Sequence, residues 1–158
     1  MNNLIVEPTL QLLDFRLDDV QVCIELQYVI KILPLVYLDS VPGSPAYLAG
    51  LMNIAGRSIP VIDLAIRLGL QRVAPYSLDS SILLCKKGQH LAGMIVDKVL
   101  DLLCVKSSAL QMNTEFNDAD SLFLAAVSAK NDFSLLVNMN KILPIEFAEN
   151  KSDSMGLT

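Results

Sequence analysis

Short apolar stretches separated by turn residues recur along the whole chain. Between Phe15 and Ile24, apolar and polar side chains alternate on both sides of Asp18 and Asp19. Alternation with a period of two is typical of half-buried strands, and two acidic residues between such runs indicate a tight turn. We therefore expect a β-hairpin at residues 15–24.

A second hairpin is predicted in the middle of the chain. Residues 51–54 and 59–62 are mainly apolar and flank Gly56, which tolerates turn conformations that strain other residues. Asp63 follows this hairpin directly. Its side chain can cap a short helix over residues 64–68, because an aspartate before an apolar run is a common helix start.

The rest of the chain repeats this pattern of short strands and turns. Further strands are expected over residues 82–85, 91–96, 99–105, 123–127 and 133–137, and a helical turn over residues 139–143. No apolar stripe with a 3.6-residue period persists, so we predict no helix longer than about three turns. The fold class is therefore all-β, with the strands arranged as barrels or a sandwich.

Composition and charge restrict the function. Hydrophobic residues make up 53% of the chain and charged residues 18%, so some apolar surface is expected to remain exposed for partners. The net charge is −5, and the only adjacent basic pair is Lys86 and Lys87. A nucleic-acid partner is not expected, because phosphate binding requires clustered cations.

No segment predicts insertion into a membrane. The longest uncharged stretch, residues 40–56, contains Pro42, Gly43 and Pro45 and is too short for a spanning helix. The first twenty residues carry several charges and lack the basic start and apolar run of a signal peptide. We expect a cytoplasmic protein.

Enzyme chemistry finds little support in the sequence. Asp63 and Asp97 each follow an apolar strand, as in an aspartic-protease dyad, but the small residues that such a dyad needs are missing. His90 is the only histidine, so a histidine-based metal site cannot be built. Three cysteines lie singly in apolar segments and are expected to be buried thiols: Cys23, Cys85 and Cys104. We predict a non-catalytic protein without metal or cofactor.

Residues 50–64 resemble the central motif of the CheW family, written G-x-x-N-x-R-G-x-x-x-P-x-x-D-L. Residues 41–50 resemble that family's P-x-x-P-x-Y/F-x-x-G loop. Residues 93–99 match its G-x-x-V-D-x-V strand, and residues 135–143 match its closing strand and helix. The pieces occur in the family's order between Phe15 and Leu143, which makes the resemblance specific.

The resemblance implies two five-stranded SH3-like β-barrel subdomains around a shared hydrophobic core. It implies one CheW-like domain over residues 12–147. One subdomain would comprise residues 12–63 with the turn at 139–147, and the other residues 80–138. Residues 148–158 are expected to form a disordered tail.

The resemblance also implies an adaptor that joins a methyl-accepting chemoreceptor tip to the regulatory domain of a CheA-type histidine kinase. The residues that would form its receptor-binding groove are Val29, Lys31, Ile54, Ala55 and Arg57. The residues that would form its kinase-binding edge are Ser80, Ser81 and Leu83.

Two residues depart from the family at the expected receptor groove. Lys31 stands where the family carries Glu, and Ala55 stands where it carries Arg. Losing both members of an ion pair leaves no lone charge, so we expect an intact fold with altered coupling. Two alternatives remain: a CheW-fold module that binds other partners or competes with a main coupling protein, and a small β-barrel enzyme.

Overall fold

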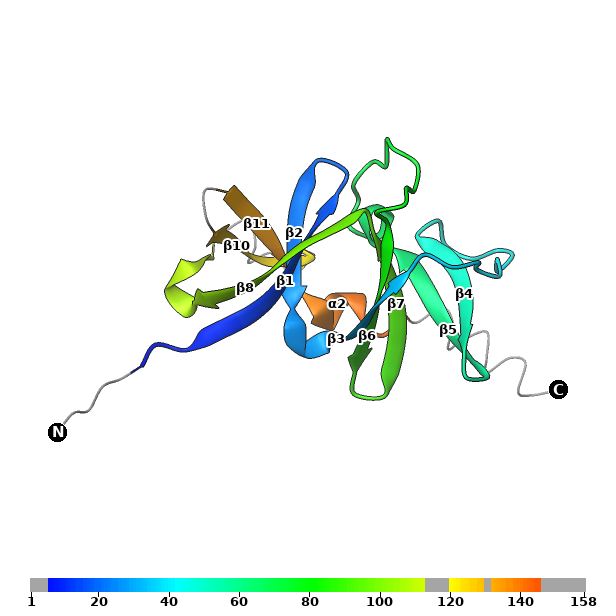
Figure 1. Ribbon diagram of the computed structural model, residues 1–158, viewed down its shortest axis with the longest axis horizontal. Coiled ribbons are helices and arrows are strands. Elements are labelled where there is room, and N and C mark those ends of the chain that lie inside the picture. Colours follow the sequence, from blue (N-terminus) through cyan, green and yellow to red (C-terminus); the bar gives the residue numbers. More distant parts are fainter. Residues whose placement is uncertain (1–5, 113–119, 130–131, 146–158) are drawn as a thin grey trace.

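In the computed structural model of the protein, the chain folds into two β-sheets that pack against each other through a shared apolar layer (Figure 1). The structure describes residues 6–112, 120–129 and 132–145. The first sheet is formed by β1 (Thr9–Leu17), β2 (Val20–Glu25), β8 (Lys98–Lys106), β9 (Leu110–Gln111), β10 (Phe123–Ala129) and β11 (Asp132–Val137). The second sheet is formed by β3 (Val29–Pro34), β4 (Leu48–Ile54), β5 (Arg57–Asp63), β6 (Ser81–Lys87) and β7 (His90–Val96).

Helices are few and short in the described part of the chain. The α-helices are α1 (Leu64–Arg67) and α2 (Met139–Ile142), and two 3₁₀ turns are η1 (Leu26–Tyr28) and η2 (Ser107–Ala109). Figure 1 shows α2 between the two sheets, where Met139 and Ile142 are buried. The all-β prediction and the limit on helix length are confirmed for the described residues.

Alternating side chains divide the interior into three apolar layers. On β1, Leu12 packs inside the first sheet, whereas Leu13 joins the layer shared by both sheets. On β6, Ile82 packs inside the second sheet, and Leu83 joins the shared layer. A strand that buries both faces needs apolar residues at consecutive positions, which explains the high hydrophobic content of this chain.

The strands are distributed between the sheets differently from the predicted subdomains. The first sheet has the order β8-β1-β2-β11-β10-β9, and the second has the order β3-β6-β7-β5-β4. The β6–β7 hairpin therefore belongs with β3 to β5, and the β1–β2 hairpin belongs with β8 to β11. The division at residues 63 and 80 was wrong, because the chain crosses between sheets at η1 and at Asp97 instead. The predicted tail at 148–158 lies outside the described residues.

The second hairpin has the turn and the helix cap that the sequence predicts. Ala55 and Gly56 form its two-residue turn, with φ angles of 52° and 80°, as a tight turn with two left-handed residues requires. The side chain of Asn53 accepts a hydrogen bond from the Gly56 amide at 3.0 Å. The Asp63 carboxylate accepts one from the Ile66 amide at 3.1 Å, which confirms the predicted helix cap.

Candidate functional site

The residues predicted for a receptor groove lie on two elements of the second sheet. Val29 and Lys31 belong to β3, which is an edge strand, whereas Ile54, Ala55 and Arg57 belong to the β4–β5 hairpin. Val29 and Ile54 are half-buried, and the other three are exposed. The predicted groove residues are thus accessible, with two apolar side chains among polar and charged ones.

The edge strand β3 adds apolar residues that the sequence argument did not include. Ile30 and Ile32 are 47% and 49% exposed, although both are large aliphatic side chains. The register is interrupted by a bulge between Val29 and Lys31, which frees Ile30 from regular pairing with β6. An edge strand with exposed isoleucines is a typical place for a partner to bind.

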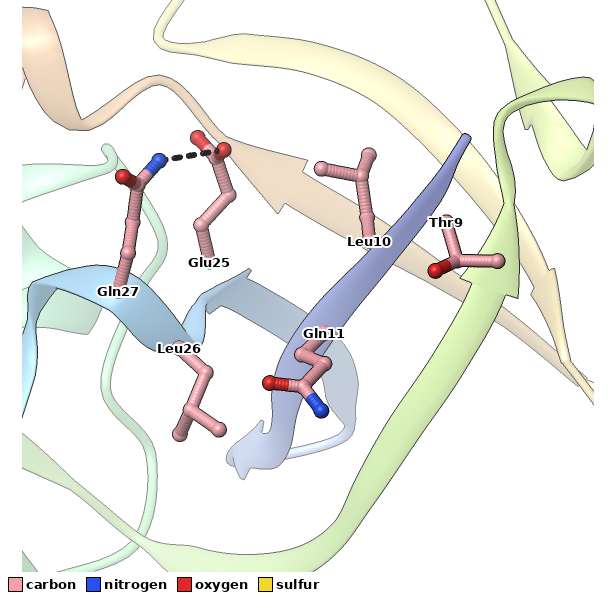
Figure 2. A pocket seen from close by; sticks show the side chains of 6 residues that line it. All are labelled: Thr9, Leu10, Gln11, Glu25, Leu26 and Gln27. Atoms are coloured by element: carbon pink, nitrogen blue, oxygen red, sulfur yellow. Dashed lines mark hydrogen bonds between the residues drawn. The ribbon is translucent and has the colours of Figure 1, made fainter. Parts of the chain in front are cut away.

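A pocket of about 500 Å³ opens where the β1–β2 hairpin leads towards β3 (Figure 2). Its lining combines two leucines with polar side chains: Thr9, Leu10, Gln11, Glu25, Leu26 and Gln27. Within it, the Gln27 side-chain amide donates a hydrogen bond to Glu25 at 2.9 Å. Leu10 packs with the first sheet and Leu26 with the shared layer, so the pocket lies where two apolar layers reach the surface.

The residues predicted for a kinase-binding edge do not form an edge. Leu83 is fully buried, because β6 lies between β3 and β7 and Leu83 faces the shared layer. Ser80 is buried as well, and its hydroxyl accepts a hydrogen bond from the Ser77 amide at 2.9 Å. Placing Leu83 on a contact surface was wrong, since its apolar run is that of a central strand.

Ser80 and Ser81 nevertheless border an open groove of about 410 Å³. Ile32 lines the groove from β3, and Leu78, which is fully exposed, lines it from the connector between α1 and β6. The exposed apolar side chains beside the two serines therefore come from neighbouring segments.

A charged cluster that the sequence argument missed joins the connector to both sheets. Arg72 donates from Nε to Asp63 at 2.7 Å and from Nη1 to Asp97 at 2.6 Å. The Tyr76 hydroxyl donates to Asp63 at 2.6 Å, and its ring lies 4.6 Å from the Arg72 guanidinium carbon. Asp97 also accepts the Asp18 amide at 2.6 Å, so this network reaches the β1–β2 turn.

The chemistry of this cluster is that of a structural clamp. Burial lowers the pKa of Arg72, but its hydrogen bonds to Asp63 and Asp97 outweigh burial and raise that pKa overall. Burial and the Asp63 carboxylate raise the pKa of Tyr76. A guanidinium bridges the two aspartates, so the arrangement differs from a protease dyad, in which the two carboxyl groups face each other directly. One feature of the sequence could have indicated this cluster, because Arg72 is the only charged residue between Arg67 and Asp79.

The cysteines differ in their surroundings. Burial raises the pKa of both Cys23 and Cys85 to about 12, so these thiols stay protonated at neutral pH. Cys104 is exposed, contrary to expectation, because its neighbours Leu103 and Val105 face the interior and Cys104 therefore lies on the opposite face of β8. Within residues 6–112, 120–129 and 132–145, no group of His, Cys, Asp or Glu side chains could hold a metal ion.

In the same part of the chain, no helix has the length and apolar character needed to cross a membrane.

Known proteins resemble this chain in both sequence and structure. The family model described as the CheW-like domain matches residues 11–146. A probable chemotaxis protein CheW of Rhizobium etli is 31% identical over 120 residues, which cover 75% of this chain and 77% of that protein. The chemotaxis protein CheW of Rhizobium meliloti is 27% identical over 141 residues, covering 88% and 90%.

A solved structure has the same fold. The crystal structure of the scaffolding protein TtCheW from Thermoanaerobacter tengcongensis matches with a TM-score of 0.75 at 22% sequence identity, covering 83% of this chain and 90% of that chain. Because the family model spans nearly all of the described residues and the Rhizobium etli relative covers three quarters of the chain, the chain belongs to the CheW-like family.

Proposed function

We propose that this protein is a non-catalytic, cytoplasmic adaptor of chemotaxis-type signalling that couples chemoreceptors to a CheA-type histidine kinase. Its membership of the CheW-like family supports the coupling role. The observation that carries the proposal is the exposed apolar edge of β3, where Ile30 and Ile32 stand beside the half-buried Val29. A binding protein needs such a surface, whereas an enzyme needs a set of reacting groups.

For the receptor, we propose the surface formed by β3 and the β4–β5 hairpin. Val29 and Ile54 would supply apolar contacts, with Lys31 and Arg57 at the margin. Half-buried apolar side chains bordered by charges are typical of protein interfaces.

For the kinase, we propose the groove next to Ser81. Leu78 and Ile32 would make the main contacts in place of the buried Leu83. Their exposure means that binding would remove apolar area from water, which favours association.

Binding measurements test the proposal directly. The full chain is titrated with a receptor tip fragment and, separately, with the kinase regulatory domain of the same organism. The proposal expects saturable binding of both, loss of receptor binding in Val29→Asp, and loss of kinase binding in Leu78→Arg. Each variant serves as the control for the other, because Val29 does not line the groove that contains Leu78. Binding of neither partner by the unaltered chain would contradict the coupling role.

The changes at Lys31 and Ala55 favour a second candidate. A module that binds the kinase and binds receptors poorly would compete with a main coupling protein. Kinase binding without receptor binding in the same titrations distinguishes this role from coupling.

A further inference from the structure

Three cations of the second sheet have no acidic partner among the described residues, and we call them the basic rim: Lys31, Arg57 and Lys86. All three side chains are exposed. The ion pairs found among the described residues are those of Arg72, so none of the three rim cations takes part in one. The charge of the rim is therefore uncompensated within the described part of the protein.

The rim borders the apolar layer inside the second sheet. Residues paired across neighbouring strands project to the same face, and each rim cation is paired with a residue of that layer. The pairs are Lys31 with Leu84, Arg57 with Ile54 and Lys86 with Leu91. Cationic side chains thus lie beside Leu84, Ile54 and Leu91 of this layer, and the last two are partly exposed.

Sheet topology brings two of the cations into one pocket. The strands β5 and β7 are parallel, with Val61 opposite Gly93, so the tips of the β4–β5 and β6–β7 hairpins lie at the same end. Arg57 from one tip and Lys86 and Gln89 from the other line a pocket of about 330 Å³.

The third cation lies close by on the neighbouring strand. Lys31 on β3 is paired with Leu84 on β6, and Lys86 lies two positions further along β6. Lys31 and Lys86 are therefore diagonal neighbours, which are typically about 7–8 Å apart.

The local charge is opposite to that of the whole protein. Residues 40–62 and 80–96 contain no aspartate or glutamate, although the chain carries a net charge of −5. Like charges at such separations repel each other, and carboxylates from a partner would remove that repulsion. An extended polyanion is a poor fit, because the rest of the chain is acidic and would repel it.

We infer that the basic rim binds an acidic segment of a protein partner, with carboxylates on the cations and an apolar side chain against Leu91. If the proposed function holds, that segment belongs to the chemoreceptor, because Lys31 and Arg57 are also part of the proposed receptor surface. Lys31 would then favour receptors with acidic tips.

Two synthetic peptides test the rim without any receptor. One alternates Glu and Leu residues in a soluble background, and the other has Gln in place of each Glu. Binding is followed by fluorescence anisotropy and by the amide NMR signals of Gly56 and Gly88, which mark the two hairpin tips.

The Glu peptide should bind and shift both glycine signals, whereas the Gln peptide should bind at least about tenfold more weakly. Binding of the Glu peptide should weaken as salt is added, because exposed charge pairs are screened. Equal binding of the two peptides, or no binding of either, would overturn the inference.

Charge reversal locates the binding site. Arg57→Glu and Lys86→Glu should each weaken Glu-peptide binding by about three- to tenfold, as expected when an exposed attraction becomes a repulsion. The matched control is Lys98→Glu, an exposed lysine on β8 whose cross-strand neighbour is Arg16. Equal weakening by the control would show that only net charge matters and would refute a local site.

Two further titrations separate the inference from the proposed function. If the Glu peptide binds at the rim but receptor tip fragments do not bind, the coupling role fails and the rim stands. If a receptor fragment binds equally well to the unaltered chain and to the Arg57→Glu, Lys86→Glu double variant, the rim inference fails and the coupling role stands. Binding to vesicles of anionic lipid without binding to the Glu peptide would also refute a protein partner.

Discussion

Replacing Arg72 with methionine should destabilise the whole domain, although Arg72 lies on a connector. The substitution keeps an apolar stem of similar length and removes both ion pairs, to Asp63 and to Asp97. Asp63 is only 1% exposed and would remain as a buried carboxylate held by the Ile66 amide and Tyr76 alone. Asp97 would keep only its bond to the Asp18 amide among the contacts described above.

The burial of each carboxylate sets the expected magnitude. Removing one member of a buried ion pair costs about 3–5 kcal/mol, whereas an exposed pair contributes at most about 1 kcal/mol. The side chain of Asp63 is 2% exposed, but those of Arg72 and Asp97 are 14% and 18% exposed. We therefore expect a loss of about 3 kcal/mol in the free energy of unfolding, near the lower end of the buried range.

Urea unfolding followed by circular dichroism measures this loss. A double variant, Arg72→Met with Asp63→Asn, also removes the unpaired carboxylate. It should recover at least about 1 kcal/mol of the free energy of unfolding lost in Arg72→Met.

Two results would refute this reasoning about Arg72. A loss below about 1 kcal/mol would mean that the cluster behaves as an exposed ion pair. Additive effects of the Arg72 and Asp63 substitutions would mean that the two side chains are not energetically coupled.

Three further predictions concern the interaction surfaces. Val29→Asp should abolish receptor binding and lower stability by only about 1 kcal/mol, since the residue is half-buried; unfolding instead would identify Val29 as a core residue. Lys31→Glu together with Ala55→Arg should bind the receptor better than the sum of the single variants, with a coupling energy of about 0.5–1 kcal/mol, whereas additivity would show that the two positions do not face each other. Leu83→Arg should cost more than about 4 kcal/mol because it buries a cation, whereas Leu78→Arg should leave the urea midpoint unchanged and weaken kinase binding. Equal stability of these last two variants would contradict the placement of Leu83.

Local patterns in the sequence were enough to predict both central hairpins. The acidic turn after Leu17 and the glycine turn after Ala55 are where the structure has them, and Asp63 caps α1. These features depend on residues close together in the chain, so hydrophobic alternation and turn chemistry specify them.

Pairing between distant strands could not be predicted in the same way. Alternation tells which face of a strand is buried and does not identify the neighbouring strand. For that reason Leu83 was assigned to an edge, although β6 is central, and Cys104 was assigned to the interior, although it lies on the exposed face of β8. The clamp at Arg72 was missed because its partners lie 9 and 25 residues away, at strand ends that only the fold brings together.

The strand order has a consequence for synthesis on the ribosome. Every strand of the second sheet lies between Val29 and Val96, so that sheet can form before β8 and β11 have been translated. The β1–β2 hairpin emerges first, but its neighbours β8 and β11 are translated last. Before they appear, the hairpin can contact the second sheet only through the shared layer, to which it contributes Phe15 and Val22. A nascent chain that stalls after Val96 therefore exposes two unpaired strand edges, which can pair with the same hairpin of another unfinished chain.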